Sequence, residues 1–303
     1  MRIRFERGLP DRLRTLHPAY FALVMATGIV ARAALLYGVY GVPEALFWLN
    51  ALFIIVLVAV TIARIIRYPG AVMADIGDHS RGVGFFTIVA AFGVFGSQIV
   101  LQAGAIGLAT CCWVVAVLLW FVITYGVLAV LTVKPHKPRL ADGINGGWLV
   151  IVVATQSVSI LTVLILPYDA SLTLQRPLML WALVLWLGGG ALYLWLMTLI
   201  FFRYTFARMS AKDLTPPYWI NMGAVAISTL AGATLLEHAA LSPLVAELAP
   251  FIKGQMLFFW AIGSWWIPML LILGVWRYVI RGVPLAYDPL YWGGVFPLGM
   301  YSV

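Results

Sequence analysis

The chain is dominated by eight long apolar runs, which short segments rich in glycine, proline and charge separate. A helix that crosses a bilayer needs roughly 20 apolar residues. Only 10% of the 303 residues are charged, whereas a soluble domain carries about 25%. We therefore expect an all-α polytopic membrane protein. The expected spans are 19–39, 44–66, 82–102, 107–132, 147–166, 178–202, 218–238 and 253–276, and a ninth begins near Tyr291.

The basic residues predict how the chain crosses the membrane. If the spans alternate in direction, 16 of the 19 lysines and arginines fall on one side. Cytoplasmic loops carry such an excess, so we expect a cytoplasmic N-terminus with a basic segment at residues 1–17. The connecting segments are short, which predicts one multi-pass domain over residues 1–303 in a plasma (inner) membrane. The net charge of +8 thus follows from topology and does not indicate nucleic-acid binding.

Three spans open with the same short pattern, proline, any residue, tyrosine and a second aromatic residue. The copies begin at Pro18 in "HPAYFALVMATG", at Pro216 in "TPPYWINMGAVA" and at Pro289 in "DPLYWGGVFPLG". Proline suits the first turn of a helix, and paired aromatic residues suit the membrane interface. Each copy opens an odd-numbered span, so we expect helical hairpins as the repeating unit.

Odd and even spans differ in composition. Odd spans carry small and polar residues, whereas even spans are bulky and apolar, as in "CCWVVAVLLWFV". Lipid solvates apolar side chains, while polar groups need protein or water. We therefore expect odd helices to form an inner ring around a pore and even helices to surround them; alternatively, the small residues only allow tight packing. The pore-lining candidates are Thr27, Gly28, Gly93, Gly96, Ser157, Gly223, Ser228, Pro297 and Gly299.

Charged residues within the spans are few. Apart from Glu44 at the first position of the second span, Glu237 is the only acid there, which disfavours a cation transporter because cation and proton sites use intramembrane carboxylates. Arg32 and Lys253 lie in or at the edge of the membrane and are candidates for attracting an anion. Arg32 could instead reach to the interface or pair with Glu237.

No enzyme signature is present in the sequence. The four histidines are scattered, and none has a ligand or catalytic partner at a suitable spacing. We therefore expect no enzyme activity, no metal and no cofactor. A membrane-embedded enzyme and a non-conducting receptor or assembly subunit are the alternatives to transport.

Four stretches resemble the tellurite-resistance/dicarboxylate transporter family, whose relatives include malic acid and sulfite transporters and plant slow-type anion channels. They are "HPAYFALVMATGIV", "INGGWLVIVVATQSVSIL", "PPYWINMGAVAIS" and "SWWIPMLLILGVWRYVIRGVPLAYDPLYWGGVFPLGMYSV". The resemblance implies ten helices in five hairpins with quasi-five-fold symmetry, odd helices lining the pore, and a homotrimer with one pore in each subunit. It also implies a phenylalanine that plugs the pore, and the matching position is Phe296.

The resemblance further implies transport of a small anion through this pore, by a channel or a uniporter that favours export. Malate or another C4-dicarboxylate, sulfite, nitrate, chloride and tellurite are all compatible with a lining of neutral polar groups. The expected tenth helix and most of the ninth are missing from the sequence. We therefore expect a shortened chain, in which the ring of inner helices would have a gap; alternatively, the chain is a natural short form that a neighbouring subunit completes.

Overall fold

The computed structural model describes residues 9–168 and 172–303. These residues form helices and turns, without a strand. Eight helices are long and apolar enough to cross a membrane, which confirms the eight predicted spans. The first part of the basic segment 1–17 lies outside the described residues.

Five helices form the inner part of the molecule. They contact one another in a cycle: each inner helix contacts the inner helix that follows it in the sequence, and the last contacts the first. In the first four, between 61% and 100% of the most apolar stretch is buried. The inner helices are α2 (Ala22–Leu36), α5 (Phe86–Gln98), α8 (Val150–Ile165), α10 (Ile220–Glu237) and α13 (Trp292–Tyr301).

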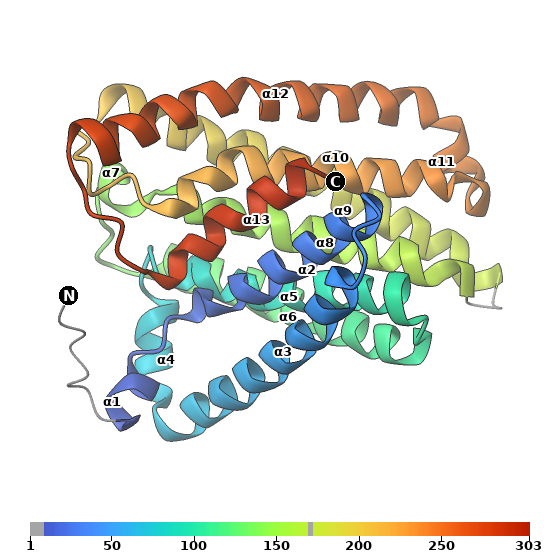
Figure 1. Ribbon diagram of the computed structural model, residues 1–303, viewed down its shortest axis with the longest axis horizontal. Helices are drawn as coiled ribbons and strands as arrows, with labels where there is room; N and C mark the ends of the chain where they lie inside the picture. Colours follow the sequence, from blue (N-terminus) through green and yellow to red (C-terminus); the bar gives the residue numbers. More distant parts are fainter. Residues whose placement is uncertain (1–8, 169–171) are drawn as a thin grey trace.

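Four longer helices surround this ring, each packed against the inner helix that precedes it. Only 17% to 44% of their most apolar stretch is buried, so most of their apolar surface is left for lipid. Figure 1 shows α3 and α12 at opposite edges of the molecule, with inner helices between them. The outer helices are α3 (Val42–Arg67), α6 (Ile106–Val133), α9 (Leu172–Phe206) and α12 (Ala249–Val275).

Indole groups connect the outer helices to the inner ones. Trp120 Nε1 on α6 donates a hydrogen bond to Thr155 Oγ1 on α8 over 2.9 Å. Trp186 Nε1 on α9 donates to the carbonyl oxygen of Ser228 on α10 over 2.8 Å. Polar groups need protein partners in hydrocarbon, so these bonds fix how α6 and α9 pack against the ring.

Short helices and turns make the connections between the long helices. The α-helical ones are α1 (Leu9–Arg14), α4 (Pro69–Ile76), α7 (Leu140–Gly143) and α11 (Pro243–Glu247). The 3₁₀ turns are η1 (Pro18–Phe21), η2 (Gly82–Phe85), η4 (Gly146–Leu149), η5 (Leu166–Tyr168), η6 (Pro216–Trp219), η7 (Ala239–Leu241) and η9 (Pro289–Tyr291), and the π-turns are η3 (Ile99–Ala103) and η8 (Trp276–Ile280).

Helix α13 closes the cycle of inner helices. It packs against both α10 and α2, so the ring is continuous along this helix instead of having the expected gap there. Its 10 residues extend about 15 Å, roughly half the hydrocarbon thickness. A hollow of about 270 Å³ lies at its last turn, beside Tyr301 and against α10 and α12.

Candidate functional site: two chambers along the inner helices

A ring of five 3₁₀ turns marks one end of the inner helices. Turns η1, η2, η4, η6 and η9 each lead into an inner helix, and they contact one another in the same cyclic order as the helices. Three begin with a side-chain cap, in which His17, Asn145 or Asp288 accepts a hydrogen bond from the backbone two residues later. The N-termini, which carry partial positive charge, therefore gather at this end.

A cavity of about 320 Å³ opens within this ring, and we call it the basic-end chamber. Residues of all five turns or of the helices that follow them contribute to its wall. Arg203 and Lys212 bring positive charge to the wall, and Asp142 and Asp213 bring negative charge. Hydrogen bonds from the backbone and hydroxyl of Ser210 hold the pKa of Asp213 below its usual value, so this carboxylate is charged and already partnered.

Arg203 is positioned by its neighbours in the chamber wall. Its Nη1 donates to the carbonyl oxygen of Ile144 over 2.9 Å and also to the hydroxyl of Tyr218. Its Nε is buried and has no partner among the described residues. A guanidinium donates through five N–H groups, so Arg203 keeps capacity to bind an acceptor in the chamber.

His17 caps the first inner helix and faces the same chamber. Burial and the nearby Arg81 guanidinium lower the pKa of His17 to about 4. The ring is therefore neutral at pH 7, and its Nδ1 accepts the backbone N–H of Ala19 over 3.1 Å.

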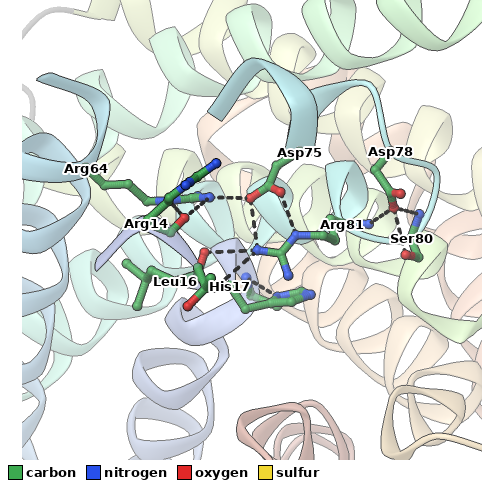
Figure 2. Close-up of polar contacts among 10 residues, drawn as sticks. Arg14, Leu16, His17, Arg64, Asp75, Asp78, Ser80 and Arg81 are labelled. Carbon is green, nitrogen blue, oxygen red and sulfur yellow. Dashed lines mark hydrogen bonds and ion pairs between the residues drawn. The ribbon is translucent and has the colours of Figure 1, made fainter. Parts of the chain in front are cut away.

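A buried charge cluster holds the segment that leads to His17. Arg64 and Arg81 both bind the carboxylate of Asp75 (Figure 2), through contacts of 2.6 Å each. Arg64 also donates to the carbonyl oxygen of Arg14, and Arg81 donates to that of Leu16. The cluster thus connects α3 and α4 to the chain just before the first inner helix.

A second and smaller cavity lies further along the same helices. We call it the far chamber, and its volume is about 30 Å³. Its polar wall residues come from α2, α5 with its π-turn η3, and α8. They are Arg32, Ser97, Gln98, Gln102 and Ser157.

The two chambers follow one another along the inner ring. On every inner helix, the residues that line the basic-end chamber precede those that line the far chamber. In each of the following pairs, the first residue lines the basic-end chamber and the second lines the far chamber: Met25 and Gly28 on α2, Thr87 and Val94 on α5, Val153 and Ser157 on α8, Ile220 and Ile227 on α10, and Phe296 and Met300 on α13.

Phe296 is the last residue of α13 that lines the basic-end chamber. Its side chain is 1% exposed and lines the basic-end chamber, and Met300, one turn further along α13, lines the far chamber.

The other residues singled out from the sequence have different positions. Gly28, Ser157 and Arg32 line the far chamber. Thr27 and Ser228 direct their hydroxyls to backbone oxygens of their own helices. Lys253 is exposed on an outer helix and lines neither chamber.

The remaining candidates lie in contacts between inner helices and line neither chamber. A Cβ on Gly93 would stand 2.7 Å from Ser157, and one on Gly223 would stand 2.7 Å from Pro297. A Cβ on Gly96 or Gly299 would meet a neighbouring helix at 2.5 or 2.8 Å. These close contacts are what the alternative interpretation, tight packing, expects, and the pore-lining role of these residues stays a prediction.

Sequence reasoning missed Arg203, Lys212 and Asn145 as chamber residues. The two cations were counted only as part of the topological charge excess. Asn145 had a signal, because an asparagine before "GGW" is a typical helix cap.

Comparison with known proteins agrees with this architecture. A model of the voltage-dependent anion channel family matches residues 15–303. The chain belongs to the voltage-dependent anion channel family. This membership confirms the family resemblance that the sequence motifs indicated.

Relatives of this member of the voltage-dependent anion channel family are known by sequence. Two proteins of Methanocaldococcus jannaschii, each named an uncharacterized transporter, are 26% and 25% identical over 95% and 96% of this chain and 83% of their own lengths. An uncharacterized membrane protein of Mycobacterium tuberculosis is 42% identical over 112 residues. That match covers 37% of this chain and 56% of the relative, so it spans about half of that protein.

Proposed function

We propose that this chain conducts small anions passively across the membrane, through the two chambers and past Phe296. The observation that carries the proposal is the order of the chambers along all five inner helices. The buried Phe296 would act as the gate.

The charges of the chambers favour anions. In the first chamber, Arg203 and Lys212 stand against Asp142 and Asp213, and Asp213 is already partnered by Ser210. In the second chamber, Arg32 is the one charged residue that the described part of the chain brings to the wall. Five helix N-termini add partial positive charge at the basic end. Proton-coupled transport normally uses carboxylates within the spans. The predicted spans hold only Glu44, at the first position of one span, and Glu237, near the end of another, so passive conduction is the simpler mechanism.

The direction of transport follows from the orientation that we propose. With the basic end in the cytoplasm, an inside-negative potential of 100 mV would favour anion exit by about 2.3 kcal/mol per charge. The membrane would be a bacterial-type inner membrane. The homotrimer that the resemblance implies stays a prediction.

The test is anion flux in liposomes that contain the wild-type chain or the Phe296→Ala variant. Nitrate, chloride, sulfite and malate are offered in turn. Phe202→Ala is the matched control, because Phe202 is half exposed on the outer helix α9 and lines neither chamber.

We expect Phe296→Ala to raise the flux of at least one anion tenfold or more, while Phe202→Ala leaves it at the wild-type level. Flux that is equal in all three proteins would refute the gate. Flux of none of the four anions in any variant would refute anion conduction itself.

A further inference from the structure

The far chamber presents hydrogen-bond donors for which the described residues offer no acceptor. Its two serine hydroxyls are not among them, because Ser97 Oγ donates to the carbonyl oxygen of Gly93 and Ser157 Oγ donates to that of Ala154, each over 2.8 Å. The donors that remain belong to Arg32 and to a chain of side-chain amides.

The amide chain begins on the outer helix α3. Asn50 is fully buried, and its Nδ2 donates to Gln98 Oε1 over 2.9 Å. Gln98 Nε2 donates in turn to Gln102 Oε1 over 3.3 Å. Gln102 Nε2, the last donor, is buried without a partner among the described residues.

The backbone changes from an α-helix to a π-turn between Gln98 and Gln102, the last residue of this series of amide hydrogen bonds. Helix α5 stops at Gln98, and Gln102 lies in the π-turn η3 that follows. Single π-turns in membrane or soluble helices are uncommon and occur often at functional sites. Here the wider turn leads to Gly104, whose φ of +61° ends the helix, and it places Gln102 in the chamber wall.

Arg32 supplies a full positive charge to the same chamber. The described residues offer it neither a hydrogen bond nor an ion pair. Glu237, which acts on it electrostatically, is exposed and makes no ion pair with it. Arg32 is only partly buried, but a cation that is partly removed from water and has no partner among the described residues still carries a desolvation cost, so an external anion would stabilise this arrangement.

We propose that Arg32 and Gln102 form a binding site for one small monovalent anion in the far chamber. The proposal rests on the proposed anion conduction, for which it would be the selective step. One cation balances one negative charge, and a volume of about 30 Å³ holds about two or three water-sized spheres at about 10–15 Å³ each, which is the scale of a small inorganic anion. A C4-dicarboxylate exceeds the chamber in both size and charge.

The test combines binding and selectivity. Nitrate is the probe, and its binding to the purified chain is followed as the rise in melting temperature with nitrate concentration. Selectivity is the nitrate-to-malate flux ratio in liposomes, measured in the Phe296→Ala background. The variants are Arg32→Gln, Arg32→Lys and Gln102→Met, and Arg176→Gln is the matched control because Arg176 is exposed and lines neither chamber.

Arg32→Gln should weaken nitrate binding tenfold to a hundredfold, the range expected for a lost hydrogen bond to a charged group, and should lower the flux ratio. Arg32→Lys should keep part of the binding, because it keeps the charge. Gln102→Met should weaken binding without a change of charge, which separates the site from a general effect of charge on folding. Arg176→Gln should change neither quantity.

Equal nitrate binding in Arg32→Gln and Arg176→Gln would overturn the site. If Phe296→Ala conducts while Arg32→Gln changes neither nitrate binding nor the flux ratio, the proposed binding site is refuted and anion conduction is supported. If nothing conducts but nitrate binding depends on Arg32, conduction fails and the site stands.

Discussion

Replacement of Asp75 should test most clearly whether the buried charge cluster stabilises the fold at the basic end. It accepts Arg64 Nη2 and Arg81 Nε over 2.6 Å each, and Arg81 Nη2 over 3.0 Å. Asp75→Asn keeps the size of the side chain but removes its negative charge. The two guanidinium groups would then face each other without an anion between them.

The magnitude follows from how deeply each arginine is buried. Loss of one partner of a buried ion pair costs about 3–5 kcal/mol, whereas an exposed pair is worth about 0–1 kcal/mol. The Arg64 side chain is 4% exposed and that of Arg81 is 30% exposed. Arg64 therefore determines most of the cost, and its remaining bonds to the Arg14 carbonyl oxygen place the expected loss near the lower bound, at about 3 kcal/mol.

The pH dependence of this carboxylate has a definite sign. Partial burial raises the pKa of Asp75, but hydrogen bonds from Arg81 and Arg64 outweigh burial and hold the pKa below its usual 3.8. Its contribution to stability is thus fully present above pH 3.8 and is lost as the pH falls below that value.

The assay is thermal unfolding of the purified protein in detergent, followed by tryptophan fluorescence. At roughly 2 °C per kcal/mol, Asp75→Asn should lower the melting temperature by roughly 6 °C. Glu247→Gln, which removes an exposed acid, is the matched control and should shift it little. The double variant Arg64→Met/Asp75→Asn should lose less than the sum of the single changes, because the unpaired buried cation is gone. A melting temperature of Asp75→Asn within 1 °C of wild type would refute the reasoning.

Two further predictions concern the turn ring and the packing of α13. The melting temperature should fall as the pH drops from 6.5 to 4, because the unfolded chain binds a proton below 6.5 whereas folded His17, with its pKa of about 4, does not. His17→Asn should reduce this slope, and an unchanged slope would contradict the assignment. Gly223→Ala should cost about 1–3 kcal/mol of unfolding free energy, because its Cβ would stand 2.7 Å from Pro297. The control Gly254→Ala, which has no neighbour within 4 Å, should be neutral, and equal melting temperatures for the two variants would argue against the contact.

Much of the fold was predictable, because its signals are local in the chain. Length and apolarity specify a spanning helix without knowledge of its neighbours, and all eight predicted spans occur in the structure. The pattern that begins at Pro18, Pro216 and Pro289 corresponds to the 3₁₀ turns η1, η6 and η9. The separation into inner and outer helices followed from composition, since lipid accepts bulky apolar faces and polar residues seek protein.

The position of each candidate residue around its helix was less predictable. Gly28 lines the far chamber, whereas Gly93 packs against Ser157 on the next helix. Both positions require a small residue, one to leave space and the other to allow contact, so residue type does not distinguish them. The rotation of a helix about its axis depends on the packing of all its neighbours.

The sequence by itself thus determined that the chain is a membrane protein with polar inner helices and apolar outer ones. It also indicated the family, and it singled out Arg32 and Lys253 as candidates for attracting an anion. Tertiary structure alone decided that Asn50, from an outer helix, would orient Gln98 and Gln102. It also decided that Phe296 would line the basic-end chamber while Met300, one turn further along α13, lines the far chamber. The physical reason is range: hydropathy and helix caps act within a few residues, whereas a cavity exists only where side chains from helices far apart in the sequence meet.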